Sequence, residues 1–100
     1  MHLLTQTIEV RWPAEIEGAS GLYDGDKQTI DILSTCGYDQ QRETLLHESL
    51  HAMLAYTHLD ALLDEQNEGA SEHLVSALAP IMLSWIRENP RIMRYLEDRL

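Results

Sequence analysis

The chain has 100 residues, 44% of them hydrophobic, which suits one domain with a modest core and excludes a large multidomain protein. Its formal net charge is −10 with only seven lysines and arginines, so a polyanion such as DNA would be repelled and nucleic-acid binding is not expected. One cysteine, the lack of a long apolar run and the lack of a signal-peptide pattern lead us to expect a cytoplasmic protein without a membrane span.

The first third of the chain is predicted to form β-strands. Ile8, Val10 and Trp12 alternate with polar residues, which is typical of a strand with one buried face, and we expect Trp12 to lie in the core. A second alternating run spans residues 28–32, and the Asp-Gly-Asp sequence before it favours a hairpin around residues 24–27. We therefore expect a small antiparallel sheet of two or three strands.

Residues 40–57 are predicted to form the first helix. The segment contains no Gly or Pro and is rich in Leu, Ala, Met, Glu and Gln, all of which favour helices. Leu46, Leu50 and Leu54 recur at helical spacing, so they are expected to share one buried face. This helix follows the predicted strands directly.

Three further segments complete the chain. Residues 59–69 are predicted to be a loop or short turn. A second helix is predicted to follow Ser71, its N-cap, with a broad apolar face that includes a core Trp85. Pro90 is typical of a helix start and predicts a short last helix that runs to Leu100. Because the strands precede the helices, the order predicts an α+β fold with a small sheet beside the first helix.

The first helix contains the motif His-Glu-x-x-His, formed by His47, Glu48 and His51. Residues four apart lie one turn from each other on a helix, so the two histidines can place imidazole nitrogens on one metal ion. Glu48 is expected to reach the zinc-bound water and take its proton as general base. Random order produces the motif in roughly 2% of such chains, so it indicates a zinc hydrolase more strongly than chance decoration of a helix.

A catalytic zinc site usually takes three protein ligands and leaves one position for water. We predict Glu72 as the third ligand, because it lies three residues before Val75 on the apolar face of the second helix. Glu68 and His73 are the alternatives. Glu68 would require the helix to begin earlier, across Gly69, which is a poor helix former.

The residues around the motif resemble a known family, the gluzincins, in which a glutamate on a following helix completes the His-Glu-x-x-His site. Residues 41–52 look like the motif helix of their minimal members, the ImmA/IrrE-like peptidases and small phage-encoded minigluzincins. Residues 72–79 are similar to the glutamate helix of that family, and residues 29–32 to the strand before the motif helix. Residues 67–72 also resemble a thermolysin-like sequence whose first glutamate is the ligand, which favours Glu68.

The resemblance implies that the sheet edge lines an active-site cleft, where an extended peptide pairs as an extra strand. The chain departs from larger gluzincins because it has no room for a second subdomain. Tyr23, Tyr56 and His58 are candidates for the Tyr or His that stabilises the oxyanion. Asp39 and Asp60 are candidates to orient a ligand imidazole through its second nitrogen.

We therefore predict a zinc metallopeptidase that acts on a peptide or protein substrate. His47, His51 and Glu72 would hold Zn²⁺, and Glu48 would be the catalytic base. A second hypothesis is a metal-stabilised phage or prophage accessory protein that binds a partner peptide without catalysis. A third is a latent enzyme whose cleft is covered by the last helix.

Overall fold

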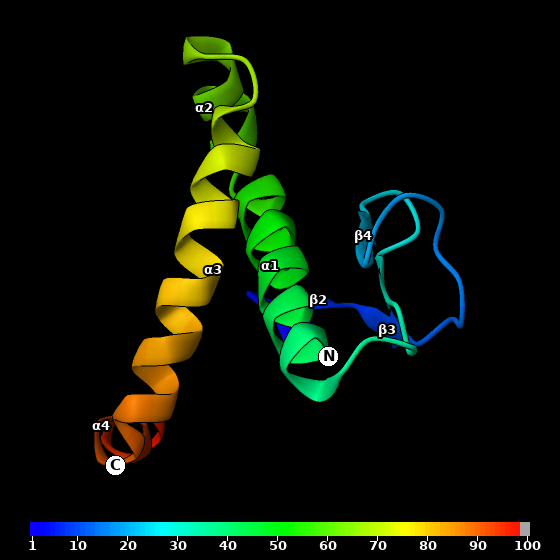
Figure 1. Cartoon of the computed structure of the whole chain (residues 1–100). Coiled ribbons are helices and arrows are strands. Elements are labelled where there is room, and N and C mark those ends of the chain that lie inside the picture. The colour runs from blue at the N-terminus through cyan, green and yellow to red at the C-terminus, as the bar shows by residue number, and fades with distance from the viewer. Residues whose placement is uncertain (99–100) are drawn as a thin grey trace.

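The computed structural model describes residues 1–98, and its fold is α+β, as the sequence predicts. Within these residues five short strands precede four helices (Figure 1). The strands are β1 (His2–Leu3), β2 (Gln6–Thr7), β3 (Glu9–Arg11), β4 (Gly21–Asp24) and β5 (Thr29–Ile32). The helices are α1 (Tyr38–Tyr56), α2 (Leu59–Gln66), α3 (Ala70–Glu88) and α4 (Pro90–Glu97).

The strands form two small sheets. β1 pairs with β2, and a three-stranded sheet has the order β3-β5-β4. The predicted hairpin is present, because β4 and β5 pair antiparallel with Tyr23 opposite Ile30. The pairing of β3 differs from the prediction: it lies parallel to β5, with Val10 opposite Ile30, so this sheet is mixed. Alternating residues define the buried face of a strand but do not determine which neighbour it pairs with.

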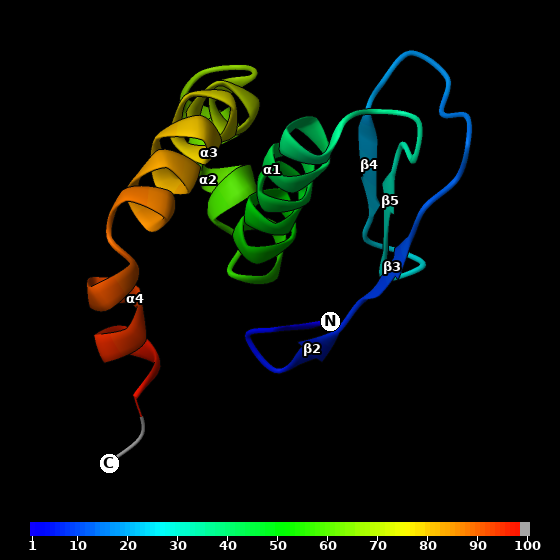
Figure 2. The ribbon, with the colours of Figure 1, turned by 60° about the horizontal axis from the view of Figure 1, so that its bottom comes forward.

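Helix α1 lies between the three-stranded sheet and α3 (Figure 2). On one side, Ala52 packs with Ile30 and Ile32 of β5 in a fully buried apolar cluster. On the other side, Leu50 packs against Val75 of α3. Side chains of α1 that lie between these two faces are therefore placed where the sheet, α1 and α3 meet.

The segment between α1 and α3 differs from the prediction. It contains helix α2, because Leu59–Gln66 has no Gly or Pro, but its eight residues are too few to show a clear helical period. Ser71 is not the N-cap of α3, since that helix begins after Gly69, whose φ is 79°. Instead, the backbone N–H and Oγ of Ser71 both donate to the carboxylate of Asp64, each over 2.9 Å. An aspartate of α2 thus satisfies a free N–H at the start of α3.

Helix α4 begins at Pro90, as predicted, and ends at Glu97, while residues 99–100 lie outside the described part of the chain. It lies at the end of α3 that is farther from α2 (Figure 1). The tryptophans predicted to lie in the core are half exposed, with 51% of Trp12 and 45% of Trp85 accessible. An apolar periodicity does not reveal whether a neighbouring element covers the face. Among the described residues, the helices are too short or too polar to cross a membrane.

Candidate metal centre

The three side chains predicted as metal ligands lie together where α1 meets α3. Nε2 of His47 is 3.2 Å from Oε1 of Glu72, and Nε2 of His51 is 2.5 Å from Oε2 of the same carboxylate. The three potential ligand atoms lie within 4.8 Å of one another. Two atoms that each lie about 2.1 Å from one tetrahedral zinc ion are about 3.4 Å apart, so the spacing fits a shared ion. The group can hold a metal ion.

Local structure explains this convergence. His47 and His51 are one turn apart on α1, and their ring centroids are 4.9 Å from each other. They lie between the face of α1 that packs on the sheet and the face that packs on α3. Glu72 lies in the first turn of α3, three residues before the buried Val75 and seven before the buried Ala79. Packing those two residues against α1 directs Glu72 toward the histidines.

The two alternative ligands lie elsewhere. Glu68 and His73 are exposed and line a separate hollow beside Leu74. Glu68 precedes Gly69 and is therefore outside α3. His73 follows Glu72 by one residue, which turns its side chain about 100° around the helix. The structure does not bring either residue to the two histidines.

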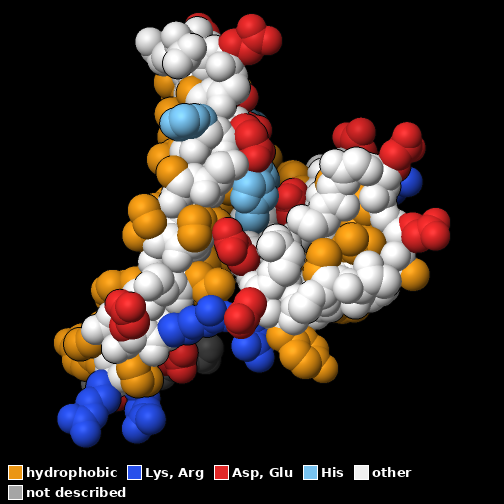
Figure 3. All heavy atoms as spheres, in the orientation of Figure 1, with side chains coloured by type: hydrophobic (Ala, Val, Ile, Leu, Met, Phe, Trp, Pro, Cys, Tyr) orange, Lys and Arg blue, Asp and Glu red, His pale blue; other side chains and the backbone are white. Residues whose placement is uncertain are grey.

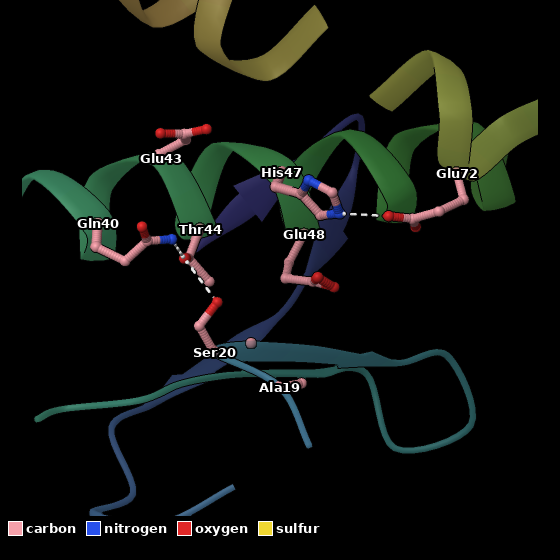
Figure 4. A pocket seen from close by; sticks show the side chains of 9 residues that line it. Ala19, Ser20, Gln40, Glu43, Thr44, His47, Glu48 and Glu72 are labelled. Atoms are coloured by element: carbon pink, nitrogen blue, oxygen red, sulfur yellow. Dashed lines mark hydrogen bonds and ion pairs between the residues drawn. The ribbon is translucent and has the colours of Figure 1, made fainter. Parts of the chain in front are cut away.

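Glu48 is adjacent to the histidines but lies on the side of α1 that faces the sheet. Its side chain is buried, with only 8% of the residue exposed. Burial raises the pKa of Glu48, and this effect exceeds the opposing effects of His47, His51 and a hydrogen bond with the backbone of Tyr23. In Figure 4 the Glu48 carboxylate points toward β4, into the space beside His47. A buried carboxylate with a raised pKa in this position is suited to accept a proton.

Glu72 has the opposite electrostatic bias. Partial burial of Glu72 raises its pKa. Hydrogen bonds and nearby histidines lower the pKa by a larger amount, so it lies below its usual value. The Oγ of Ser76 donates a hydrogen bond of 3.0 Å to Oε1, and the nearby His51 and His47 also favour the charged form. The anionic state that a metal ligand requires is therefore the favoured state of this carboxylate.

A hollow of about 430 Å³ opens between α1 and the start of β4 (Figure 4). Its wall is polar: Nε2 of Gln40 donates to Oγ1 of Thr44 over 3.1 Å, and that oxygen is 3.4 Å from Oγ of Ser20. Figure 3 shows acidic and histidine side chains on the concave surface between α3 and the sheet. The lining residues are Ala19, Ser20, Gly21, Gln40, Glu43, Thr44, His47, Glu48 and Glu72.

The three candidates for an oxyanion-stabilising residue do not line this hollow. The hydroxyl of Tyr56 is 2.8 Å from Oγ1 of Thr5. His58 precedes α2 in a left-handed conformation, with φ of 63°. Tyr23 packs against the apolar cluster under the sheet. The structure therefore assigns no oxyanion-stabilising side chain among them.

Asp39 and Asp60 also have other partners. Asp39 accepts a hydrogen bond of 2.9 Å from Nη2 of Arg87, and Asp60 accepts one of 2.7 Å from the backbone of Ala61. Among the described residues, neither carboxylate bonds to the imidazole of His47 or His51. Helix α4 does not cover the hollow, because none of its described residues line it and α4 lies beyond α3 (Figure 2).

Two residues that sequence reasoning missed bring β4 against α1. A Cβ on Gly21 would lie 2.3 Å from Cγ2 of Thr44 and 3.2 Å from Cγ of Glu48. Thr44 is itself buried, with 6% of the residue exposed. Glycine therefore permits the close approach that places Glu48 against β4. The one signal in the sequence is that Thr44 precedes Glu48 by one helical turn.

We expect Gly21→Ala to destabilise the fold by about 1–3 kcal/mol, because the new methyl group overlaps Thr44. Adding Thr44→Ser removes Cγ2 and keeps the hydroxyl, so the double variant should regain at least about half of the lost stability. Urea unfolding of the wild type, both single variants and the double variant measures these free energies. Additive losses in the double variant would contradict the contact.

No family model, curated protein or solved structure matches the chain. The description of the fold and the site therefore comes from this chain alone. Together they define an α+β protein in which two histidines of α1 and a glutamate of α3 can hold a metal ion.

Proposed function

We propose that the protein is a zinc-dependent metallopeptidase of the minimal gluzincin type. The observation that carries this proposal is the convergence of His47, His51 and Glu72, with the buried Glu48 beside them. Two imidazoles and one carboxylate form a ligand set typical of catalytic zinc sites, in which a fourth position remains for water. The likeness of residues 41–52 to a gluzincin motif helix supports the same class.

The donor atoms suit zinc as the native metal. Calcium and magnesium prefer sites made of oxygen ligands, whereas imidazole nitrogens together with a carboxylate suit zinc. His47 and His51 would hold the ion from α1, and Glu72 would hold it from α3. When bound, zinc supplies Lewis acidity, which polarises a carbonyl group and activates water for attack near neutral pH.

Glu48 is the proposed general base. It is next in sequence to a proposed ligand but faces the hollow rather than the Glu72 carboxylate (Figure 4). In this position it takes a proton from the attacking water and later gives it to the amine that leaves when the peptide bond breaks. Its raised pKa favours the protonated form that this second transfer needs.

A peptide is the proposed substrate because of the strand beside the site. β4 is one of the two outer strands in the sheet order β3-β5-β4, and the hollow lies at its first residue, Gly21. An extended peptide can bind at a strand edge through its backbone groups. The small side chains of Ala19 and Ser20 leave room for a substrate next to Glu48.

A metal-stabilised binding protein without catalysis is the second candidate function. The small core favours it, since the two clusters of buried apolar residues contain only seven members among the described residues. An ion held by α1 and α3 would link two helices and add folding free energy. Under this candidate, Glu48 has no chemical role.

The test of the proposed function is cleavage of fluorescein-labelled casein and of a mixed synthetic peptide library by the zinc-loaded protein. We expect hydrolysis that a chelator stops and added zinc restores. Glu68→Ala serves as a control and should cleave at the wild-type rate. If protein that binds one zinc per chain cleaves neither probe, the peptidase proposal fails and the second candidate is favoured.

A further inference from the structure

Helix α4 presents an uncovered apolar face. Ile92, Tyr95 and Leu96 are 47%, 77% and 61% exposed, and the helix has no buried residue. These three side chains share one side of α4, because residues three and four apart lie on the same face. Among the described elements, α4 contacts only α3. A helix of eight residues is too short to be stable without tertiary packing. A partner that packs against this face would therefore stabilise α4.

Helix α3 also carries exposed apolar side chains. Ile81 is 64% exposed and Trp85 is 45% exposed. Together with Pro80 they line an open hollow of about 430 Å³. Figure 3 shows hydrophobic side chains along the side of α3 that faces away from the sheet, continuing to its lower end.

Three of the charged residues of α4 oppose the dipole of the helix, whereas Arg94, in the last turn, agrees with it. Arg91 lies in the first turn, where the helix carries partial positive charge, whereas Glu97 and Asp98 lie at its negative end. Each of these charges is therefore unfavourable within a single copy. None of the ion pairs among residues 1–98 involves them. An antiparallel helix would supply the opposite charge at both ends.

We propose that two copies of this chain associate through α4, with the two helices antiparallel about a two-fold axis. The axis places Arg91 of each copy beside Asp98 of the other, because a two-fold contact is reciprocal. The same contact covers Ile92, Tyr95 and Leu96 with their counterparts. The contact thereby accounts for both the apolar face and the three charges that oppose the dipole.

The charge distribution along the chain favours a second copy at this end. Residues 1–86 carry 14 acidic and three basic side chains, whereas residues 87–98 carry three of each. If two copies meet through residues 87–98, the acidic residues 1–86 of each copy stay apart, which limits the repulsion between them. The contact involves only one short helix of each copy, so we expect weak association, with a dissociation constant on the order of micromolar or weaker.

Sedimentation velocity of the full chain over micromolar to millimolar concentrations tests this proposal. The wild type should shift from monomer to dimer, and Ile92→Asp with Leu96→Asp should weaken association at least about tenfold. Circular dichroism of each variant checks that the fold is kept. A wild type that stays monomeric over this range overturns the proposal, as does one that binds anionic lipid vesicles but not itself.

Charge reversal tests the antiparallel arrangement. Arg91→Glu alone, and Glu97→Arg with Asp98→Arg, should each weaken association at least about tenfold, because like charges then face each other. The variant that combines all three changes restores opposite charges across the axis and should recover wild-type affinity within about threefold. If the combined variant associates no better than its parents, the antiparallel contact is wrong.

Discussion

Glu48→Gln should keep its zinc and lose peptide hydrolysis by about 10²–10⁴-fold, the usual contribution of a general base. The substitution preserves the size of the buried side chain, of whose residue only 8% is exposed, but removes its ability to accept a proton. The amide can still bond to the backbone of Tyr23 in β4. The rate of casein cleavage at matched zinc content measures this effect.

Glu43→Gln is the matched control for that measurement. Glu43 lines the same hollow and lies one turn before His47, but we assign it no part in catalysis. The control variant should cleave casein within about twofold of the wild-type rate, because only the general base contributes the larger factor. Full activity in Glu48→Gln would contradict the proposed mechanism, and equal losses in both variants would assign the effect to the charge of the hollow.

Glu72→Ala should abolish the stabilisation that zinc gives to the wild type. At a zinc concentration of 100 times the dissociation constant, binding adds about 2.7 kcal/mol to the free energy of unfolding. For a domain of this size, that gain raises Tm by about 10 °C or more. Removing Glu72 leaves ligands on α1 alone, so zinc no longer bridges α1 and α3. Thermal unfolding with and without zinc measures both shifts.

Glu68→Ala distinguishes the two glutamates that the sequence left open. Glu68 lies outside α3 and lines a different hollow, so its removal should leave the zinc-dependent rise in Tm within about 2 °C of the wild-type value. The reverse pattern, in which Glu72→Ala keeps the rise and Glu68→Ala loses it, would show that the thermolysin-like likeness of residues 67–72 identifies the ligand.

Features governed by local spacing could be predicted from the sequence. The helix that carries His47 and His51 follows from composition and period, and the direction of Glu72 follows from its distance to Val75 along α3. The hairpin of β4 and β5 follows from turn residues between two short strands. In each case the structure depends on residues that are close to one another in the sequence.

Features that depend on packing between distant segments could not be predicted. The parallel pairing of β3 with β5 joins residues about 20 positions apart, and nothing in either strand specifies its neighbour. The close approach of Gly21 to Thr44 exists only once β4 lies on α1. The exposure of Trp85 likewise depends on which face of α3 another element covers.

We propose above all that this chain binds one zinc ion through two histidines and a glutamate. Elemental analysis of metal per chain, on purified wild type beside His47→Ala, tests it most directly because it needs no substrate. We predict about one zinc per wild-type chain and almost none in the variant, because two remaining ligands hold the ion weakly. A folded wild type that binds no zinc when zinc is supplied would contradict the claim.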